Sequence, residues 1–469
     1  MVRILREAWY HVRHMISLKK IFSVVKKKKK DQAKDTAQRS DPIVIPRSQH
    51  SISRKQIDPH ALKILYSLKD AGFDAYLVGG CVRDLLLGHE PKDFDVTTNA
   101  SPEQIHKLFR KSRLIGRRFK LVHVGFGRNV IEVATFRAPP EEDQHVDGRI
   151  MRDNVFGTLE QDAWRRDFTI NALYYDISDF SIIDYTGGIA DLEAGKIRLI
   201  GDVETRYRED PVRMLRAIRF VGKLGLLLDD ETERFIPQLA NLLADIPAAR
   251  LFDESLKLYL AGNAAVTHEL LCHYGLFEVL FPQTAALLHT EQDNYPRTLI
   301  TKALENTDIR IDEGKPVTPA FLFAALMWEP VRQRWQEHKD RKIPPIPALQ
   351  RAATEVISEQ VRRVAVPKRF TLMTRDIWTL QIRLEQRFGK KAYRTLTHPK
   401  FRAGYDFLLL RVQAGEPLSE LADWWTVFQE AEEAEQQKMV NSLSSTDAGG
   451  PRKRRRRKRK KPAAKSSSE

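Results

Sequence analysis

The sequence predicts a mixed domain of strands and helices, an α+β head, followed by a long region that contains only helices. Two patterns lead to this prediction. Between residues 46 and 200, short apolar runs of strand length alternate with amphipathic segments of helical length. From residue 201 to about 430, apolar residues recur at i, i+3 and i+4, and Pro and Gly separate the segments.

The predicted elements of the first domain surround a pair of glycines. Segment 59–71 has the periodicity of an amphipathic helix, and a second helix follows Gly79 and Gly80 through residues 85–87. Apolar runs predict strands at residues 76–78, 94–96, 130–135, 172–175 and 181–184. The later helical segments include residues 211–224, 252–260, 320–328, 371–384 and 405–412.

Both ends of the chain are strongly basic. Apolar residues at helical spacing among basic ones, then a lysine run and a polar stretch, predict an N-terminal extension and linker over residues 1–45. The extension is either a solubilising tail or, through residues 1–30, a contact with an anionic membrane surface or RNA. The chain becomes polar from residue 431 and ends in the basic run 452–461, which predicts a disordered tail over 431–469.

Composition narrows the class of protein. The 469 residues carry a formal net charge of +16 and a pI of about 9.6, which suits a polyanionic partner such as nucleic acid. Two cysteines, Cys81 and Cys272, are too few for a disulfide framework or a zinc finger. No apolar run reaches the roughly 18 residues of a spanning helix, and basic residues interrupt the N-terminal apolar stretch. We therefore expect a cytoplasmic protein.

Asp93 and Asp95 form the sharpest local signal. Residues i and i+2 of a strand point to the same face, so a strand at this position would project both carboxylates together. Two carboxylates repel each other unless a divalent cation neutralises them. The pair is therefore either a metal site or a solvated strand edge.

The paired glycines lie just before these aspartates. A strand that runs into Gly79 and Gly80 and then into a helix exposes backbone N–H groups that favour phosphate, and Arg83 adds a positive charge. Alone, this is an ordinary turn. Followed closely by paired aspartates, it predicts phosphoryl or nucleotidyl transfer.

A third carboxylate would complete the coordination of two metal ions. Glu132 lies between apolar residues on a predicted core strand, where a charged side chain needs a partner. The alternative is a satisfied edge glutamate, and Asp167 is the other candidate acid.

Four ordered motifs then identify a family resemblance: GGCVRD at 79–84, KDFDVTT at 92–98, RRDFTINAL at 165–173 and REDPVRMLRAIRF at 208–220. The chain resembles the class II nucleotidyltransferases, which comprise bacterial poly(A) polymerases and CCA-adding enzymes. The resemblance is strong over residues 60–280. It implies a head (46–200) with the polymerase-β-like nucleotidyltransferase fold, a helical neck (201–262) that recognises the base, and a helical body (263–430) that binds RNA.

Within this superfamily the chain is more similar to bacterial poly(A) polymerase I. The segment LIGRRFKLVHV at 114–124 resembles the one that distinguishes poly(A) polymerases from CCA-adding enzymes. The chain is also longer than a minimal CCA-adding enzyme and has basic extensions at both ends.

The resemblance implies roles residue by residue. The metal ligands would be Asp93, Asp95 and Glu132, and Asp167 would be counted with the catalytic acids. The incoming nucleotide would be bound by Gly79, Gly80, Arg83, Arg166 and Asn171, with Arg165 in the same motif near it, and its base would be read by Glu209, Asp210, Arg213 and Arg216. Asp210 and Arg213, three apart on a helix, would share one face and offer an acceptor and donors together. Without the family, residues 208–216 would equally suit a surface ladder of ion pairs.

The implied activity is template-independent addition of adenylates from ATP to RNA 3′ ends, with two Mg²⁺ ions as cofactors and pyrophosphate as product. Such an enzyme would act in mRNA polyadenylation, processing and turnover, with RNA 3′ ends, ATP and RNA-decay proteins as partners. The alternatives are a CCA-adding tRNA nucleotidyltransferase and a non-catalytic RNA-binding protein.

Three weaker motifs have simpler explanations. The segment from His268 to His273 lacks the second histidine of a zinc-protease motif, because Cys272 occupies that position. Gly125-Phe126-Gly127 lacks the third glycine of a dinucleotide fingerprint. We expect Trp424 and Trp425 to pack a helix rather than to stack on bases.

The basic tail generates a prediction. Deleting residues 449–469 should weaken RNA affinity and flatten its dependence on salt, because lysine and arginine contacts with phosphates release counterions. RNA-binding titrations over a range of salt concentrations measure both quantities. An unchanged salt slope would show that the tail has another role, such as protein contact.

Overall fold

The computed structural model describes residues 41–116, 120–138, 145–146, 149–150, 155–288 and 295–446. The predicted N-terminal helix, residues 117–119 of the LIGRRFKLVHV segment and the basic run near the C-terminus lie outside the described residues. The chain divides into two compact units. Unit 1 comprises residues 1–290, 304–317 and 358–366, and unit 2 comprises the remainder.

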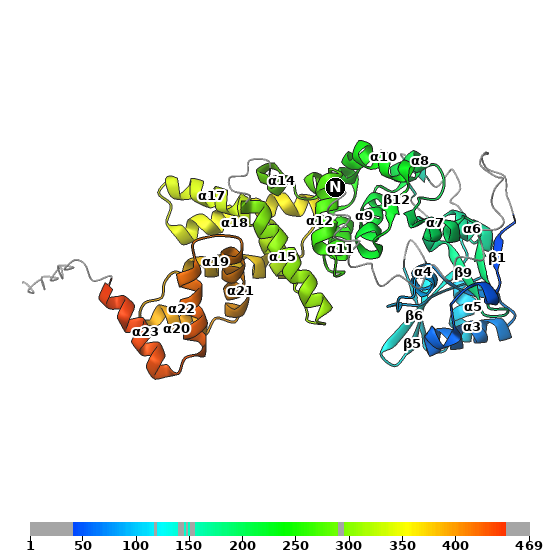
Figure 1. Ribbon diagram of the computed structural model, residues 1–469, viewed down its shortest axis with the longest axis horizontal. Coiled ribbons are helices and arrows are strands. Elements are labelled where there is room, and N and C mark those ends of the chain that lie inside the picture. The colour runs from blue at the N-terminus through cyan, green and yellow to red at the C-terminus, as the bar shows by residue number, and fades with distance from the viewer. Residues whose placement is uncertain are drawn as a thin grey trace, which may run out of the picture. The chain divides into compact units, whose positions relative to one another are not determined.

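Unit 1 contains an eight-stranded mixed sheet in the order β1-β10-β9-β2-β3-β6-β5-β4 (Figure 1). The strands are β1 (Ile43–Ile45), β2 (Ala75–Val78), β3 (Asp95–Thr98), β4 (Ser112–Ile115), β5 (Leu121–Phe126), β6 (Asn129–Thr135), β9 (Leu173–Asp176) and β10 (Ile182–Asp184). The pairing of β3 with β6 is parallel, and the other pairings in this sheet are antiparallel. The predicted α+β head is confirmed, and all five predicted strands are present with slightly shifted ends.

Helices cover both faces of the sheet, but at different strands. Helix α3 (Pro59–Asp70) packs on β2 and β3, and α5 (Pro102–Leu108) packs on β4, β5 and β6. Helix α6 (Leu159–Trp164) contributes Ala163 to an apolar cluster with Val78 and Tyr174, which are paired on β2 and β9. On β6, Glu132 and Ala134 alternate with buried residues and retain solvent contact, whereas on β3 only Asp95 does.

The rest of unit 1 is mainly helical. It contains α4 (Gly80–Leu86), η6 (Thr169–Asn171), α7 (Gly188–Ala194), α8 (Val203–Glu209), α9 (Val212–Leu224), α10 (Asp230–Leu239), α11 (Ala248–Tyr259), α12 (Ala264–His273), α13 (Leu276–Leu280) and α14 (Pro282–Leu288). Short strand pairs occur at β7 (His145–Val146) with β8 (Arg149–Ile150), and at β11 (Lys196–Ile197) with β12 (Leu227–Leu228). Helix α9 packs on α11 and α12, and Gly222 permits this approach, because an added Cβ would lie 2.6 Å from Thr267 Oγ1.

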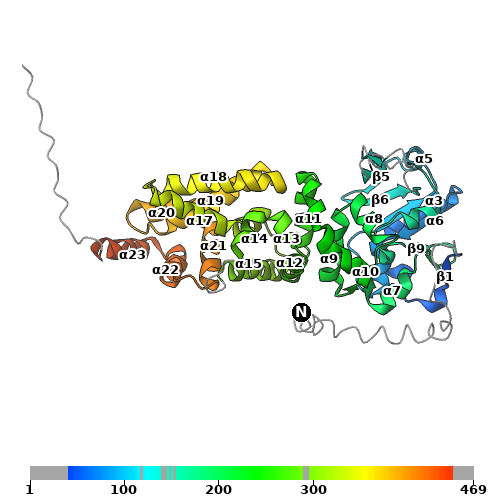
Figure 2. The ribbon, with the colours of Figure 1, turned by 90° about the horizontal axis from the view of Figure 1, so that it is seen from above.

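Unit 2 is built around α19 (Lys368–Leu384), which packs on α16 (Pro319–Leu326), α20 (Lys390–Leu396) and α21 (Phe401–Gln413). Figures 1 and 2 show α19 and α21 side by side. Trp378 Nε1 donates a hydrogen bond to the Ala324 carbonyl at 3.1 Å. The other helices are α17 (Trp328–Asp340), α22 (Ser419–Glu430) and α23 (Glu433–Thr446), while α15 (Tyr295–Asp312) and α18 (Pro345–Arg363) have residues in both units.

The last helices confirm one prediction and correct another. Trp425 is fully buried and its Nε1 donates to the Leu384 carbonyl at 2.8 Å, so this residue packs a helix as expected. A disordered tail from residue 431 is wrong for its first part, because α23 occupies Glu433–Thr446. Val440 anchors this helix in the same apolar cluster as Trp425.

Two further expectations concern motifs and membranes. His268 is a core residue, since its ring lies edge-on to Phe277 and its Nε2 is 3.7 Å from Cys272 Sγ. Within the described part of the chain, no helix combines the length and apolar character that crossing a membrane requires.

Candidate active site

The sheet brings three segments that are distant in sequence to one place. Val78 of β2 is paired with Asp95 of β3, and Asp95 is paired with Glu132 of β6. Directly paired residues project from the same face of a sheet, so the Asp95 and Glu132 side chains are neighbours. Gly79 follows Val78 immediately, which places the glycine turn beside them.

Asp93 lies near these acids, but not as the sequence predicts. Strand β3 begins at Asp95, so Asp93 is in the preceding loop and the expected i, i+2 arrangement within one strand is wrong. Asp93 is exposed, and its charge still acts on the Asp95 carboxyl. The acidic group is therefore built from a loop and two parallel strands.

The electrostatics of Asp95 differ from those of a solvated aspartate. Partial burial, together with the negative charge of Glu132, raises the pKa of Asp95 to about 6, although Arg166 opposes the shift and Asp93 adds to it. Asp95 nevertheless keeps solvent contact at the strand end. The site therefore holds negative charge that the protein does not fully compensate.

These residues fit a hard divalent cation that arrives with phosphate. Within the described residues, no three His, Cys, Asp or Glu side chains gather closely enough to hold a metal ion alone. Mg²⁺ commonly binds through one or two carboxylates and completes its shell with water and substrate phosphates. Asp93, Asp95 and Glu132 offer this type of donor set, and a cation bound there would relieve the repulsion between Asp95 and Glu132 that helps to raise the pKa of Asp95.

The glycine turn has the conformation that the motif requires. Gly79 precedes α4 with φ of +79°, a region that side chains with a Cβ rarely adopt. A Cβ at this position would lie 3.6 Å from Arg166 Nη1. The turn and the Arg166 guanidinium are therefore neighbours, next to the acids.

The guanidinium of Arg83 already has hydrogen-bond partners within the protein. Arg83 is almost completely buried, and its guanidinium donates to Asn171 Oδ1 at 2.6 Å and to Asp84 Oδ1 at 2.6 and 2.8 Å. Its charge also lies over the Phe220 ring, 5.2 Å from the centroid. Arg83 and Asn171 thus connect α4, η6 and α9, and their direct contact with a nucleotide stays a prediction.

A residue that the sequence analysis missed holds the two arginines of the third motif. Asp162 is fully buried and accepts from Arg165 Nη2 at 2.7 Å, from Arg166 Nη2 at 2.9 Å and from the Tyr174 hydroxyl at 2.8 Å. Although burial opposes ionisation, the two guanidinium groups hold the pKa of Asp162 well below its usual range. The signal was present in the sequence, since Asp162 precedes the arginines by three and four residues, the spacing of helical neighbours.

Asp167 faces the helix α9. Its Oδ2 accepts from Arg216 Nε at 2.7 Å and also from Arg216 Nη2, while its Oδ1 accepts from Asn171 Nδ2 at 3.2 Å. Although burial opposes ionisation, Arg216 lowers the pKa of Asp167 to about 2. The structure thus joins two predicted site residues in one ion pair, and a catalytic role for Asp167 stays a prediction.

The predicted pairing of Asp210 with Arg213 on one helix is wrong. Helix α8 ends at Glu209 and α9 begins at Val212, because Pro211 lacks an N–H and disfavours helical backbone at Asp210. Arg213 instead donates to Glu209 Oε2 at 3.0 Å. Asp210 Oδ2 accepts from Arg250 Nη2 at 2.7 Å, a partner on α11 that local sequence patterns did not indicate.

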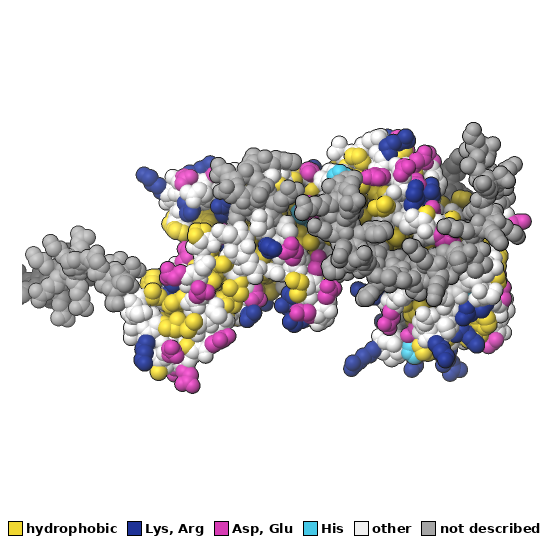
Figure 3. Space-filling model, viewed as in Figure 1, with side chains coloured by type: hydrophobic (Ala, Val, Ile, Leu, Met, Phe, Trp, Pro, Cys, Tyr) yellow, Lys and Arg dark blue, Asp and Glu magenta, His cyan; other side chains and the backbone are white. Residues whose placement is uncertain are grey.

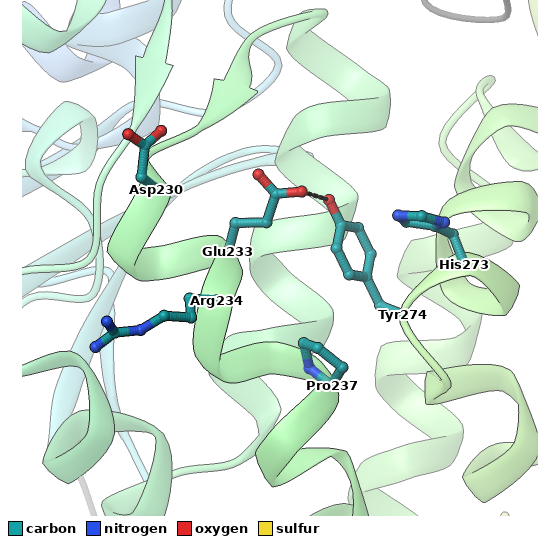
Figure 4. A pocket seen from close by; sticks show the side chains of 6 residues that line it. All are labelled: Asp230, Glu233, Arg234, Pro237, His273 and Tyr274. Carbon is teal, nitrogen blue, oxygen red and sulfur yellow. Dashed lines mark hydrogen bonds between the residues drawn. The ribbon is translucent and has the colours of Figure 1, made fainter. Parts of the chain in front are cut away.

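A separate pocket of about 530 Å³ lies between α10 and the end of α12. Figure 4 shows the Tyr274 hydroxyl donating to Glu233 Oε1, at 2.8 Å, across this pocket. Its lining residues are Asp230, Glu233, Arg234, Pro237, His273 and Tyr274, none of which was a predicted site residue.

Comparison with known proteins identifies the family. Residues 75–198 match a model described as the poly A polymerase head domain, residues 225–288 a probable RNA and SrmB-binding site of polymerase A, and residues 341–461 the polymerase A arginine-rich C-terminus. Poly(A) polymerase I of Escherichia coli is 51% identical over 427 residues, covering 89% of this chain and 92% of that protein. The chain belongs to the bacterial poly(A) polymerase I family.

Two further similarities agree with this assignment. Poly(A) polymerase I of Haemophilus influenzae is 48% identical, covering 88% of this chain and 94% of that protein. The solved structure of a Bacillus stearothermophilus CCA-adding enzyme with CTP is 28% identical, with a TM-score of 0.51, covering 82% of this chain and 84% of that one. The expected nucleotidyltransferase head followed by a helical region is confirmed.

The raised pKa of Asp95 predicts a pH-dependent effect on stability. The folded protein holds this proton up to about pH 6, whereas an unfolded chain loses it near pH 4, so stability falls as the pH rises between these values. Asp95→Asn should therefore stabilise the metal-free protein by about 1 kcal/mol at about pH 8, a value reduced because Asp95 keeps solvent contact. Below about pH 4 the two proteins should have the same free energy of unfolding. Urea unfolding with a chelator at both pH values measures the difference, and equal stability at about pH 8 would contradict it.

The ion pair of Asp167 predicts the opposite pH dependence. Asp167→Ala leaves a partly buried Arg216 without its carboxylate, which should lower the free energy of unfolding by about 1 kcal/mol at neutral pH. Because the pKa of Asp167 is lowered, this contribution is present above about pH 4 and should shrink as the pH falls toward 2. A matched control is Glu204→Ala, which removes an exposed pair with Arg208 and should cost less than about 0.5 kcal/mol. Similar losses in the two variants would contradict a structural role for the Asp167 pair.

Proposed function

We propose that the chain is a polynucleotide adenylyltransferase that extends RNA 3′ ends with adenylates from ATP, without a template. The observation that carries this proposal is the pairing of Asp95 with Glu132 beside the Gly79 turn. Relatives named poly(A) polymerase I align over almost their whole length, which supports the choice of ATP and RNA as substrates.

The acids would bind the catalytic cations. Asp93, Asp95 and Glu132 would hold them, and bound Mg²⁺ would supply charge neutralisation on the phosphates and a lowered pKa for the RNA 3′-hydroxyl. Gly79, Gly80 and Arg166 lie on the β2 side of Asp95 and would hold the triphosphate through backbone N–H groups and a guanidinium. Asp162 would keep Arg166 oriented toward this turn.

The start of the neck would read the base. Arg213 is fixed by Glu209 and Asp210 is fixed by Arg250, so donors and an acceptor are held in place before a nucleotide binds. Such preorganised polar groups discriminate strongly, since a wrong base would leave them unpaired. Arg216, held by Asp167, would complete this surface.

The remaining regions would bind RNA. We assign catalysis to residues 46–200, base recognition to residues 201–262, and RNA binding to residues 263–430 and the basic tail. RNA-decay proteins and a membrane surface would be further partners of the terminal extensions. The matched family model for residues 225–288 is described as a probable RNA-binding site, which supports an RNA contact near the neck. The second candidate function is CCA addition to tRNA, favoured by the structural likeness to a CCA-adding enzyme.

One assay tests the proposal. The wild-type protein is given a generic RNA or a tRNA without its terminal CCA, with each nucleotide supplied singly. Long tails from ATP alone are expected, whereas CTP-dependent extension of tRNA that ends after CCA would favour the second function. Absence of incorporation would favour a non-catalytic RNA-binding protein.

Variants of the acids test the mechanism. Asp93→Ala and Asp95→Ala should each reduce incorporation by at least about a thousandfold while leaving the fold intact, because the divalent cations lose a ligand. Asp70→Ala is the control, since Asp70 is an exposed aspartate at the end of α3. Near-normal incorporation by a folded Asp93→Ala or Asp95→Ala protein would contradict the assigned site.

A further inference from the structure

Asp95 and Glu132 belong to a longer row of side chains that crosses four strands. Glu132 is paired with Asp95 on β3 and with His123 on β5, and His123 is paired with Arg113 on β4. Paired residues share a face, so all four side chains project from the side opposite the buried Val96, Val122 and Val133. His123 Nε2 lies 3.6 Å from Glu132 Oε2, which shows that the row is continuous at its centre.

Asp95 is the end of this row that lies next to the proposed triphosphate site. The glycine turn and Arg166 lie on the β2 side of Asp95, while Glu132, His123 and Arg113 lie on the β6 side. In nucleotidyl transfer the attacking and leaving oxygens are in line on opposite sides of the phosphorus. If pyrophosphate leaves on the β2 side, the RNA 3′-hydroxyl approaches from the β6 side, along the row.

The two side chains of the row that lie farthest from Asp95, His123 and Arg113, suit binding to a polyanion. Arg113 is exposed and has no acidic partner among the described residues, and His123 is about one-third exposed. Exposed basic residues also lie near the edge strand, namely Arg110, Lys111 and Lys120, of which Lys120 pairs with Glu103 at 3.2 Å. Figure 3 shows Lys and Arg side chains over the part of unit 1 that contains α3, α5 and β5, where the helices cover the face of the sheet opposite the row.

We propose that His123 and Arg113 bind the phosphates of the last two linkages of the RNA, with His123 at the terminal linkage and Arg113 at the one before it. This assignment rests on the proposed function. Neighbouring strands are about 5 Å apart, so His123 lies about 10 Å from Asp95 and Arg113 about 14 Å, an order that matches successive phosphates along the strand. Both side chains bind backbone rather than bases, which suits an enzyme that accepts many 3′ ends.

The test uses RNA primers with one neutral methylphosphonate linkage, placed at the terminal linkage, at the penultimate linkage or several linkages upstream. Single adenylate addition gives kcat/KM for RNA and KM for ATP. His123→Ala and Arg113→Ala should each lower kcat/KM for ordinary RNA by about tenfold, since each removes a hydrogen bond to a charged phosphate. KM for ATP should stay within about twofold, because these residues lie on the side away from the triphosphate.

The two variants should respond to different primers. A neutral terminal linkage should lower kcat/KM for RNA about tenfold in the wild-type enzyme. In His123→Ala it should lower kcat/KM little further, because the contact with that phosphate is already absent. Arg113→Ala should show the same coupling at the penultimate linkage, and the upstream linkage should couple to neither. His123→Gln, which keeps a donor, should recover part of the loss.

Arg128→Ala is the matched control, because Arg128 is an exposed arginine at the turn of the β5–β6 hairpin and outside the row. Losses that simply add in every combination, or an equal loss in Arg128→Ala, would overturn the assignment while leaving adenylate addition intact. Failure of the wild-type protein to extend ordinary RNA with ATP would instead overturn the proposed function.

Discussion

The parallel pairing of β3 with β6 is the constraint on which the site depends. It places Asp95 directly beside Glu132, so two carboxylates share one face of the sheet at a distance where their charges interact. Val96 and Val133, the next residues along these strands, are buried on the face that α3 and α5 cover. A slip of one residue would bury the acids and expose the valines, so the apolar core enforces an arrangement that electrostatics opposes.

Three carboxylates of the head, Asp95, Asp162 and Asp167, differ in their surroundings and therefore in their pKa values. Asp162 and Asp167 lie among guanidinium groups, which keep both carboxylates ionised. Among the residues that the structure describes, no guanidinium is in direct contact with Asp95, and the pKa of Asp95 rises to about 6. The protein thus compensates the charges that hold its arginines and leaves charge available where a cation and phosphates would bind.

Helix α9 contacts the head through several residues on one helical face. Arg216 binds Asp167, Phe220 packs edge-on against Phe168 and under the Arg83 guanidinium, and Lys223 binds Asp84. Residues 216, 220 and 223 are spaced by four and three, so they lie on one side of the helix. The glycine turn and helix α9 are consequently held by the same network of contacts.

The sequence by itself determined the local features of this protein. Period-two and period-3.6 patterns predicted the strands and helices, and motif spacing identified the glycine turn, the acids and the family, because these signals depend on residues close together in the chain. Only the tertiary structure decided which charges meet. Arg83 is buried against Asn171, Asp210 binds Arg250, and Asp93 lies outside the strand. The row from Asp95 to Arg113 likewise depends on the register of four strands. Such pairings arise from non-local packing, which no short pattern in the chain encodes.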